Sequence, residues 1–288
     1  MSWFRRKLMY EAETVKALKF TATGNSTLGF ASHDTNPELE YSYDGRNWTV
    51  WSEGANAYAD IAINDGKCVY VRGNNPNRFN TGSSNYTQFK MTGSLACEGN
   101  IMHLLSYEND IISLKGNYCF TRLFYGCTSL TAAPELPATN CLYSCYSYMF
   151  YGCTGLTSAP ELPATALGDY CYNWMFGYCR NLTAAPALPA TTLASGCYNS
   201  MFRQCTSLTS APELPATALA NSCYSYMFNS CKSLKLITML ATNISASNYL
   251  SNWVSGVSAT GTFTKKAGVS IPSGVSGIPA GWNVIEVN

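Results

Sequence analysis

Cysteine is the residue of this sequence whose number and spacing most directly suggest chemistry. The chain has 13 cysteines. Most of them form two series with a constant spacing of 26 residues: Cys119, Cys145, Cys171, Cys197 and Cys223, and Cys127, Cys153, Cys179, Cys205 and Cys231. Clustered cysteines can bind zinc or form disulfides, but no Cys-x-x-Cys pair and no histidine partner accompanies these series. We therefore expect buried free thiols, which behave as small hydrophobes, and no metal site.

Carboxylates follow the same period at Glu135, Glu161 and Glu213, with Ala187 interrupting the series. Carboxylates stacked one repeat apart repel one another, so we expect them to be solvated rather than paired for acid–base catalysis. A glycosidase needs two carboxylates at a defined separation in a cleft, which a regular wall does not supply. No motif of a serine hydrolase, a metalloprotease or a phosphate-binding loop is present either. The sequence thus predicts a non-enzymatic protein without a cofactor.

Composition excludes several classes of partner. Charged residues make up 12% of the chain and the formal net charge is +1, so no basic surface for nucleic acid is expected. No run of 18 apolar residues is present, and we expect no membrane insertion. The first 20 residues lack the apolar run and cleavage site of a secretion signal. We therefore expect a protein that is made in a cytoplasm and leaves it only when another structure carries it.

The 26-residue period extends to the residues expected to form the core. Met-Phe pairs begin at 149, 175, 201 and 227, and a leucine series runs from Leu130 to Leu234. The unit reads CYxxMFxxCTxLTxAPxLPATxLxxx without insertion, and its length is typical of one leucine-rich repeat coil. We predict a strand in LTxAP and a helical or 3₁₀ turn in CYxxMFxxC, whose apolar residues fall at i, i+4, i+5 and i+8. The expected fold is a mixed α/β solenoid.

The rest of the chain divides around this array. We expect an N-terminal docking helix over residues 1–15, an antiparallel β-sandwich over 16–100, the repeat solenoid over 101–257 and a short β-cap over 258–288. The docking helix would be amphipathic and would anchor the protein in a larger assembly. A frayed terminus is the alternative for the same segment. The candidate anchor residues are Trp3, Phe4, Arg5, Arg6, Leu8 and Met9.

The repeats MFYGCTGLTSAPELPATAL (149–167) and MFRQCTSLTSAPELPATAL (201–219) resemble the BspA-type leucine-rich repeats of gut Bacteroidales surface proteins. The resemblance extends to LEYSYDGRNWTVWSEG and CEGNIMHLLSYEND before the array and to NWVSGVSATGTFTKK after it. It covers about residues 16 to 288. It implies a solenoid that acts by surface contact.

The resemblance also implies two locations. Surface members of this family carry a secretion or lipoprotein signal, which the opening MSWFRRKLMYEAE does not show. Similar arrays occur in crAss-like or related phages that infect these bacteria. We therefore expect a virion protein, assembled in the host cytoplasm as a head or tail fibre or decoration. Other virion proteins would contact its N-terminal segment, and a homotrimer is one expected assembly. A bacterial cell-surface adhesin is the alternative.

Positions that vary on the regular frame are the candidate binding surface. The tyrosines that follow the first cysteine of each unit are expected in the core, whereas the row of Tyr148, Trp174 and Tyr226 could be buried or could form an exposed aromatic strip. The full candidate set is Tyr148, Asp169, Tyr170, Trp174, Arg180, Asn181, Arg203, Gln204 and Tyr226. The predicted function is adhesion to a host surface glycan or protein. A polysaccharide-acting enzyme with its site in the β-domain is the remaining alternative.

Overall fold

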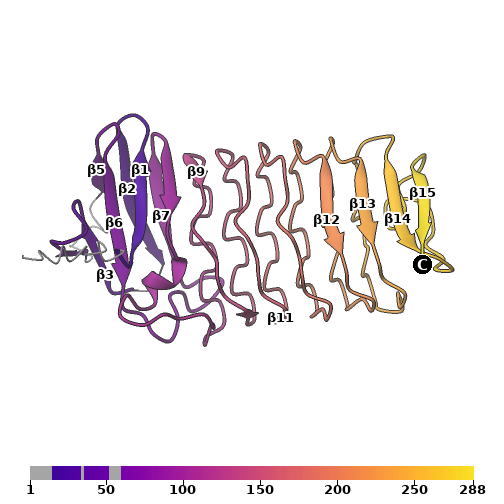
Figure 1. Cartoon of the computed structure of the whole chain (residues 1–288), viewed down its shortest axis with the longest axis horizontal. Coiled ribbons are helices and arrows are strands. Elements are labelled where there is room, and N and C mark those ends of the chain that lie inside the picture. The colour runs from indigo at the N-terminus through magenta and orange to yellow at the C-terminus, as the bar shows by residue number, and fades with distance from the viewer. Residues whose placement is uncertain (1–14, 34–35, 52–59) are drawn as a thin grey trace, which may run out of the picture.

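The computed structural model describes residues 15–33, 36–51 and 60–288. In Figure 1 the N-terminal strands stand at one end of an elongated body, and successive coils of chain follow along its long axis to the C terminus. The candidate anchor residues, from Trp3 to Met9, lie outside the described residues.

Two sheets form the N-terminal part. One has the order β4-β3-β6-β1-β8-β9 and the other the order β5-β2-β7. The sheets face each other through aromatic side chains, because the rings of Phe20 and Phe89 lie 5.0 Å apart, and β1 alternates buried and partly buried residues as a half-covered strand should. The strands are β1 (Leu18–Ala22), β2 (Ser26–His33), β3 (Leu39–Ser42), β4 (Thr49–Val50), β5 (Ile61–Ile63), β6 (Cys68–Gly73), β7 (Tyr86–Thr92), β8 (Leu95–Glu98) and β9 (Leu130–Ala132).

These sheets continue directly into the coils. All pairs in the larger sheet are antiparallel except β8 and β9, which are parallel. The amide of Phe89 donates to the carbonyl of Leu123 at 2.7 Å, and the amide of Leu95 donates to that of Ser129 at 2.9 Å. Strands β7 and β8 therefore act as the coil before the first repeat, and no linker separates the two parts.

One side of the coils is a parallel sheet. Its longest stretch, β12-β13-β14-β15, closes the C-terminal end of the body (Figure 1). Leu236 pairs with Thr262, one 26-residue period later, so the register follows the repeat. In the middle coils the corresponding segments are joined by a parallel bridge between Ser158 and Ala184. The strands of this stretch are β12 (Ser210–Leu214), β13 (Leu236–Met239), β14 (Thr262–Lys266) and β15 (Asn283–Val287), whereas β10 (Asn140–Cys141) and β11 (Ala166–Leu167) form a separate two-stranded parallel sheet in another segment of the repeat.

The opposite segment of each coil, CYxxMFxxC, is a chain of tight turns that we call the turn wall. In one coil the amides of Cys171, Met175 and Cys179 each donate to the carbonyl three residues earlier, which closes three turns. The amides of Tyr172, Trp174 and Phe176 donate instead to carbonyls of the next coil, at 2.9–3.0 Å. Amides thus alternate between closing a turn and joining two coils.

The backbone of the turn wall contains a left-handed residue at every fourth position. In the coil just described these residues are Tyr170, Trp174 and Tyr178, with φ of 56°, 57° and 62°. A positive φ at the third residue of a four-residue turn is the geometry of a type II turn. Each such non-glycine residue costs about 1–2 kcal/mol, which the hydrogen bonds between coils offset.

The mixed α/β prediction is therefore wrong. The only helix in the described part of the chain is the 3₁₀ turn η1 (Ile101–Leu104), capped by the Asn100 side chain. In a helix every backbone amide donates to a carbonyl of the same helix, whereas in the turn wall every second amide donates to a carbonyl of the neighbouring coil. The backbone of the turn wall repeats every four residues, which is close to the 3.6-residue period of an α-helix. Apolar residues spaced at i, i+4 and i+8 therefore share one face in either structure, and for this reason the sequence pattern suggested a helix.

Two rows of stacked rings run through the core. The phenylalanine row continues from the N-terminal sheets through successive coils as far as Phe228, with centroids 4.9–5.8 Å apart: Phe89, Phe124, Phe150, Phe176, Phe202 and Phe228. The expected core tyrosines form the second row, and all are buried: Tyr146, Tyr172, Tyr198 and Tyr224. Both rows end on Trp253, which lies 6.4 Å from Tyr224 and 6.0 Å from Phe228. Its indole nitrogen donates to the carbonyl of Gly277 at 2.8 Å.

Left-handed strain can be tested at one position that differs between coils. Gly152 and Gln204 are equivalent and have φ of 73° and 65°, and a Cβ on Gly152 would meet nothing closer than 3.8 Å. We expect Gly152→Ala to destabilise the protein by about 1 kcal/mol and Gln204→Gly to stabilise it by a similar amount. Urea unfolding measures both, and two changes of the same sign would contradict this assignment.

Trp253, at the end of both ring rows, should contribute strongly to the free energy of unfolding. Trp253→Ala removes the residue on which both rows terminate, so we expect a loss of about 3–5 kcal/mol. Val275→Ala, at a residue that is 50% exposed, is the matched control and should change stability by less than about 0.5 kcal/mol. Equal effects of the two substitutions in chemical denaturation would show that the rows do not depend on Trp253.

Candidate functional site

A continuous set of aromatic and arginine side chains crosses the turn wall from coil to coil. All of its members are partly buried, which distinguishes them from the fully buried rows beneath. We call it the aromatic–arginine strip, and it consists of Tyr86, Arg122, Tyr125, Tyr148, Tyr151, Trp174, Tyr178, Arg203 and Tyr226.

The rings of the strip stack on one another. Tyr148 and Trp174 lie 5.9 Å apart with planes 11° from parallel, and Tyr125 and Tyr151 lie 4.9 Å apart at 4°. Tyr151 also lies 5.2 Å from Tyr178. Burial against these neighbours raises the pKa of the Tyr148 phenol, although Arg122 opposes the shift. The contacts hold the side chains in defined positions and give the strip a fixed shape.

Two arginines complete the strip by lying over ring faces. The Arg122 guanidinium is 4.7 Å from the centroid of Tyr148, and that of Arg203 is 5.0 Å from Trp174 and 5.4 Å from Tyr226. Their Nε atoms are buried and have no hydrogen-bond partner within the described residues. None of the ion pairs found in that part of the chain involves either arginine. The strip therefore carries two positive charges that form no ion pair with a carboxylate of the described residues.

The turn wall positions these side chains through its left-handed residues. Arg122, Tyr148, Trp174 and Tyr226 occupy equivalent places and have φ of 55–58°, so they leave the backbone in the same way and line up along the solenoid. Gly177 makes room for the indole, because a Cβ there would lie 2.7 Å from the Trp174 ring. Side-chain identity can vary here while the backbone stays constant.

The structure brings together only part of the predicted set. Tyr148, Trp174, Arg203 and Tyr226 belong to the strip, and Arg180 lies at its margin with its guanidinium 5.9 Å from the Tyr178 ring.

The other predicted residues lie elsewhere or support the frame. Asp169 accepts a hydrogen bond from the amide of Ser195 at 3.0 Å, and Asn181 donates to the carbonyl of Thr154 at 2.8 Å. Tyr170 is exposed and packs near Tyr143, 6.1 Å away. Gln204 occupies a left-handed position and is partly buried.

Sequence reasoning missed five members of the strip. Arg122 lies 26 residues before Tyr148, and Tyr125 and Tyr151 precede Arg203 by whole periods, so applying the period to every variable position would have found them. Tyr178 is a turn-wall residue equivalent to Gln204 and could have been found in the same way. Tyr86 lies on β7, outside the repeat, and no sequence signal marks it.

The cysteine series form a hydrogen-bonded part of the core. All 13 cysteines are free and all except Cys68 are buried. In the second series each thiol donates to a phenylalanine carbonyl, 38 residues earlier for Cys127 and 29 residues earlier for the others, as Cys179 does to Phe150 at 3.0 Å. Burial raises the pKa of Cys127, Cys145, Cys179 and Cys223 to about 12. These thiols are therefore poor nucleophiles.

Metal-binding and membrane features are not seen in the described part of the chain. No group of three or more His, Cys, Asp or Glu side chains there could hold a metal ion. No helix within those residues is long and apolar enough to cross a bilayer. Glu135, Glu161 and Glu213 are exposed on the arm of the coil that carries the prolines.

Comparison of the chain with family models, with curated proteins and with solved structures found no match.

The buried thiols predict a loss of stability at alkaline pH. In the unfolded chain a thiol ionises near pH 8.5, whereas at Cys127, Cys145, Cys179 and Cys223 it ionises near 12 in the fold. The contribution of these thiols is thus complete below about pH 8.5 and declines as the pH rises toward 12, by about 1.4 kcal/mol per pH unit for each thiol. Urea unfolding between pH 7.5 and 10.5 measures the decline.

Thiol titration provides the control. At pH 8 a thiol reagent should react rapidly only with Cys68, and Cys68→Ser should abolish that reaction. In denaturant all 13 cysteines should react. Rapid reaction of several thiols in the native protein would contradict the packing described above.

Proposed function

We propose that the protein is a non-enzymatic adhesion protein and that the aromatic–arginine strip is its binding surface. The observation that carries the proposal is the continuity of the strip across successive coils, at positions where the repeat varies. A surface of this kind suits an extended ligand, because each coil adds a further contact of similar geometry.

The chemistry of the strip favours an acidic glycan. Tyrosine and tryptophan side chains held in fixed positions supply contact area and hydrogen-bonding groups at low entropic cost. Arg122 and Arg203 add positive charge without an ion-pair partner among the residues that the structure describes, and guanidinium groups bind carboxylate and sulfate oxygens in a planar, paired geometry. We therefore infer that the ligand is a host surface polysaccharide that carries acidic groups.

The carrier of the protein is a separate question from its ligand. The resemblance of the repeats to BspA-type arrays supports both a phage particle and a bacterial surface. Peptide mass spectrometry of gradient-purified phage particles and of the washed bacterial envelope would separate them, because a virion component should appear at stoichiometric level in the particle band.

Binding to defined polysaccharides tests the proposal. The probes are the acidic polysaccharides heparin, chondroitin sulfate and polygalacturonate, with dextran and mannan as neutral counterparts, each measured by biolayer interferometry against the full chain. We expect at least one acidic polysaccharide to bind in a salt-sensitive manner and to remain intact. Trp174→Ala and Arg203→Ala should each weaken this binding about tenfold, as loss of a central aromatic or arginine contact usually does.

Tyr143→Ala is the matched control, since Tyr143 is 40% exposed and lies outside the strip. It should bind as the wild type does. Trp174→Tyr should restore most of the affinity and confirm that the loss is local. Equal binding of neutral and acidic polysaccharides, or unchanged binding by both alanine variants, would reject the strip as the site.

A further inference from the structure

We propose that the N-terminal sheet carries a second ligand site, a pocket that binds a neutral sugar. The pocket has a volume of about 540 Å³, which is within the range of small-molecule sites. Its lining comes from β3, β4, the end of β6 and the loop after η1. None of these residues belongs to the aromatic–arginine strip, so this inference is independent of the proposed function.

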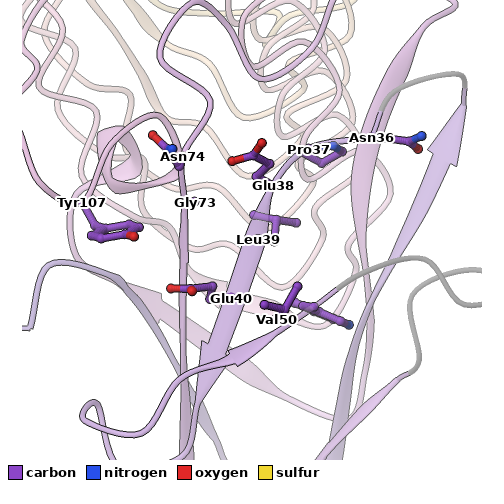
Figure 2. Close-up of a pocket in the computed structure, with 10 residues that line it drawn as sticks. Asn36, Pro37, Glu38, Leu39, Glu40, Val50, Gly73, Asn74 and Tyr107 are labelled. Carbon is purple, nitrogen blue, oxygen red and sulfur yellow. The ribbon is translucent and has the colours of Figure 1, made fainter.

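Two carboxylates border the pocket at the start of β3, Glu40 on the strand and Glu38 directly before it. Glu38 and Glu40 are two residues apart and point to the same side, toward Asn74 and Tyr107, while Leu39 points the other way (Figure 2). The backbone amide of Asn74 donates to the backbone carbonyl of Glu38 at 3.2 Å, which places Glu38 beside the end of β6. Two carboxylates, an amide and a phenol therefore line the same pocket.

The backbone beneath the pocket, around Gly73, is held in place by close packing. Gly73 lies between Glu38 and the backbone of η1, where a Cβ would come within 2.5 Å of the Leu104 carbonyl and 2.8 Å of the Glu38 carbonyl. The Asn75 side chain donates to both of these carbonyls, at 2.8 and 3.0 Å. The site is thus formed before any ligand arrives, which reduces the entropic cost of binding.

A clamped arginine orients one side of the pocket. The Arg72 guanidinium lies 3.8 Å from the ring centroids of both Trp48 and Tyr107, and its Nε donates to the Glu40 carboxylate at 2.7 Å. Arg72 therefore fixes the Tyr107 ring and holds the Glu40 carboxylate in place as an acceptor. Because Arg72 occupies a face of Tyr107, the pocket does not form the open aromatic cage that a cationic ligand requires.

The charges and polar groups select a neutral, hydroxyl-rich ligand. Arg72 compensates Glu40, and Glu38 leaves one negative charge at the exposed mouth, which disfavours an acidic sugar. Carboxylate oxygens accept hydrogen bonds from adjacent hydroxyls, and Asn74 can both donate and accept. The apolar surface of Val50, which is 68% exposed, suits the C–H face of a sugar ring. These requirements together are met by a neutral pyranose.

Saturation-transfer NMR and calorimetry with methyl glycosides test the site. The probes are the methyl glycosides of glucose, galactose, mannose, fucose and N-acetylglucosamine, with methyl glucuronide as the acidic counterpart. We expect at least one neutral glycoside to bind with millimolar affinity and more tightly than methyl glucuronide. Glu38→Ala and Asn74→Ala should each weaken binding about tenfold, and neither exposed side chain is needed for folding.

Glu108→Ala is the control, because Glu108 is an exposed glutamate next to Tyr107 that does not line the pocket. It should bind as the wild type does, and so should Trp174→Ala, whose substitution affects the strip alone. Absence of binding by every neutral glycoside, preference for the glucuronide, or unchanged binding by Glu38→Ala would overturn the inference. Loss of binding in Trp174→Ala would move the sugar to the strip and would also reject the pocket.

Discussion

Ring stacking at a constant interval is the interaction on which the rest of this structure depends. The phenylalanine row starts between the N-terminal sheets, where Phe89 lies 4.3 Å from Phe30, and continues through the coils at up to 5.8 Å. A coil can join the row only if it returns its phenylalanine to the same place, so each coil must have the same length and backbone path. The absence of insertions between Cys119 and Cys231 is the sequence record of that constraint.

The same constraint explains the unusual backbone of the turn wall. Every coil must offer amides to the next coil and also close its own turns, which requires a left-handed residue at regular intervals. Thiols suit the interior of this arrangement, because they pack as apolar groups and still donate to the phenylalanine carbonyls. The frame is thus satisfied internally, and the side chains that project outward from it are available for recognition.

The two proposed sites have opposite character and lie on different parts of the molecule. The strip is extended, carries positive charge and crosses several coils, whereas the pocket is compact, carries carboxylates and lies on the β4-β3-β6 side of the N-terminal sheet. That side is the edge farthest from β9, where the solenoid begins. One rigid body could therefore contact a long acidic chain and a single neutral sugar at separate places.

The sequence by itself determined the period, the coil length and the buried side chains, because side-chain spacing records which residues must meet from one coil to the next. It also indicated the variable positions, including Tyr148, Trp174 and Arg203. Only the tertiary structure decided the backbone of the turn wall, since half of its amides bond to residues about 25 positions away and local spacing resembles that of a helix. Tertiary structure likewise placed Tyr86 beside Arg122 and Tyr107 beside Arg72, contacts between segments that share no repeat and that no local pattern could predict.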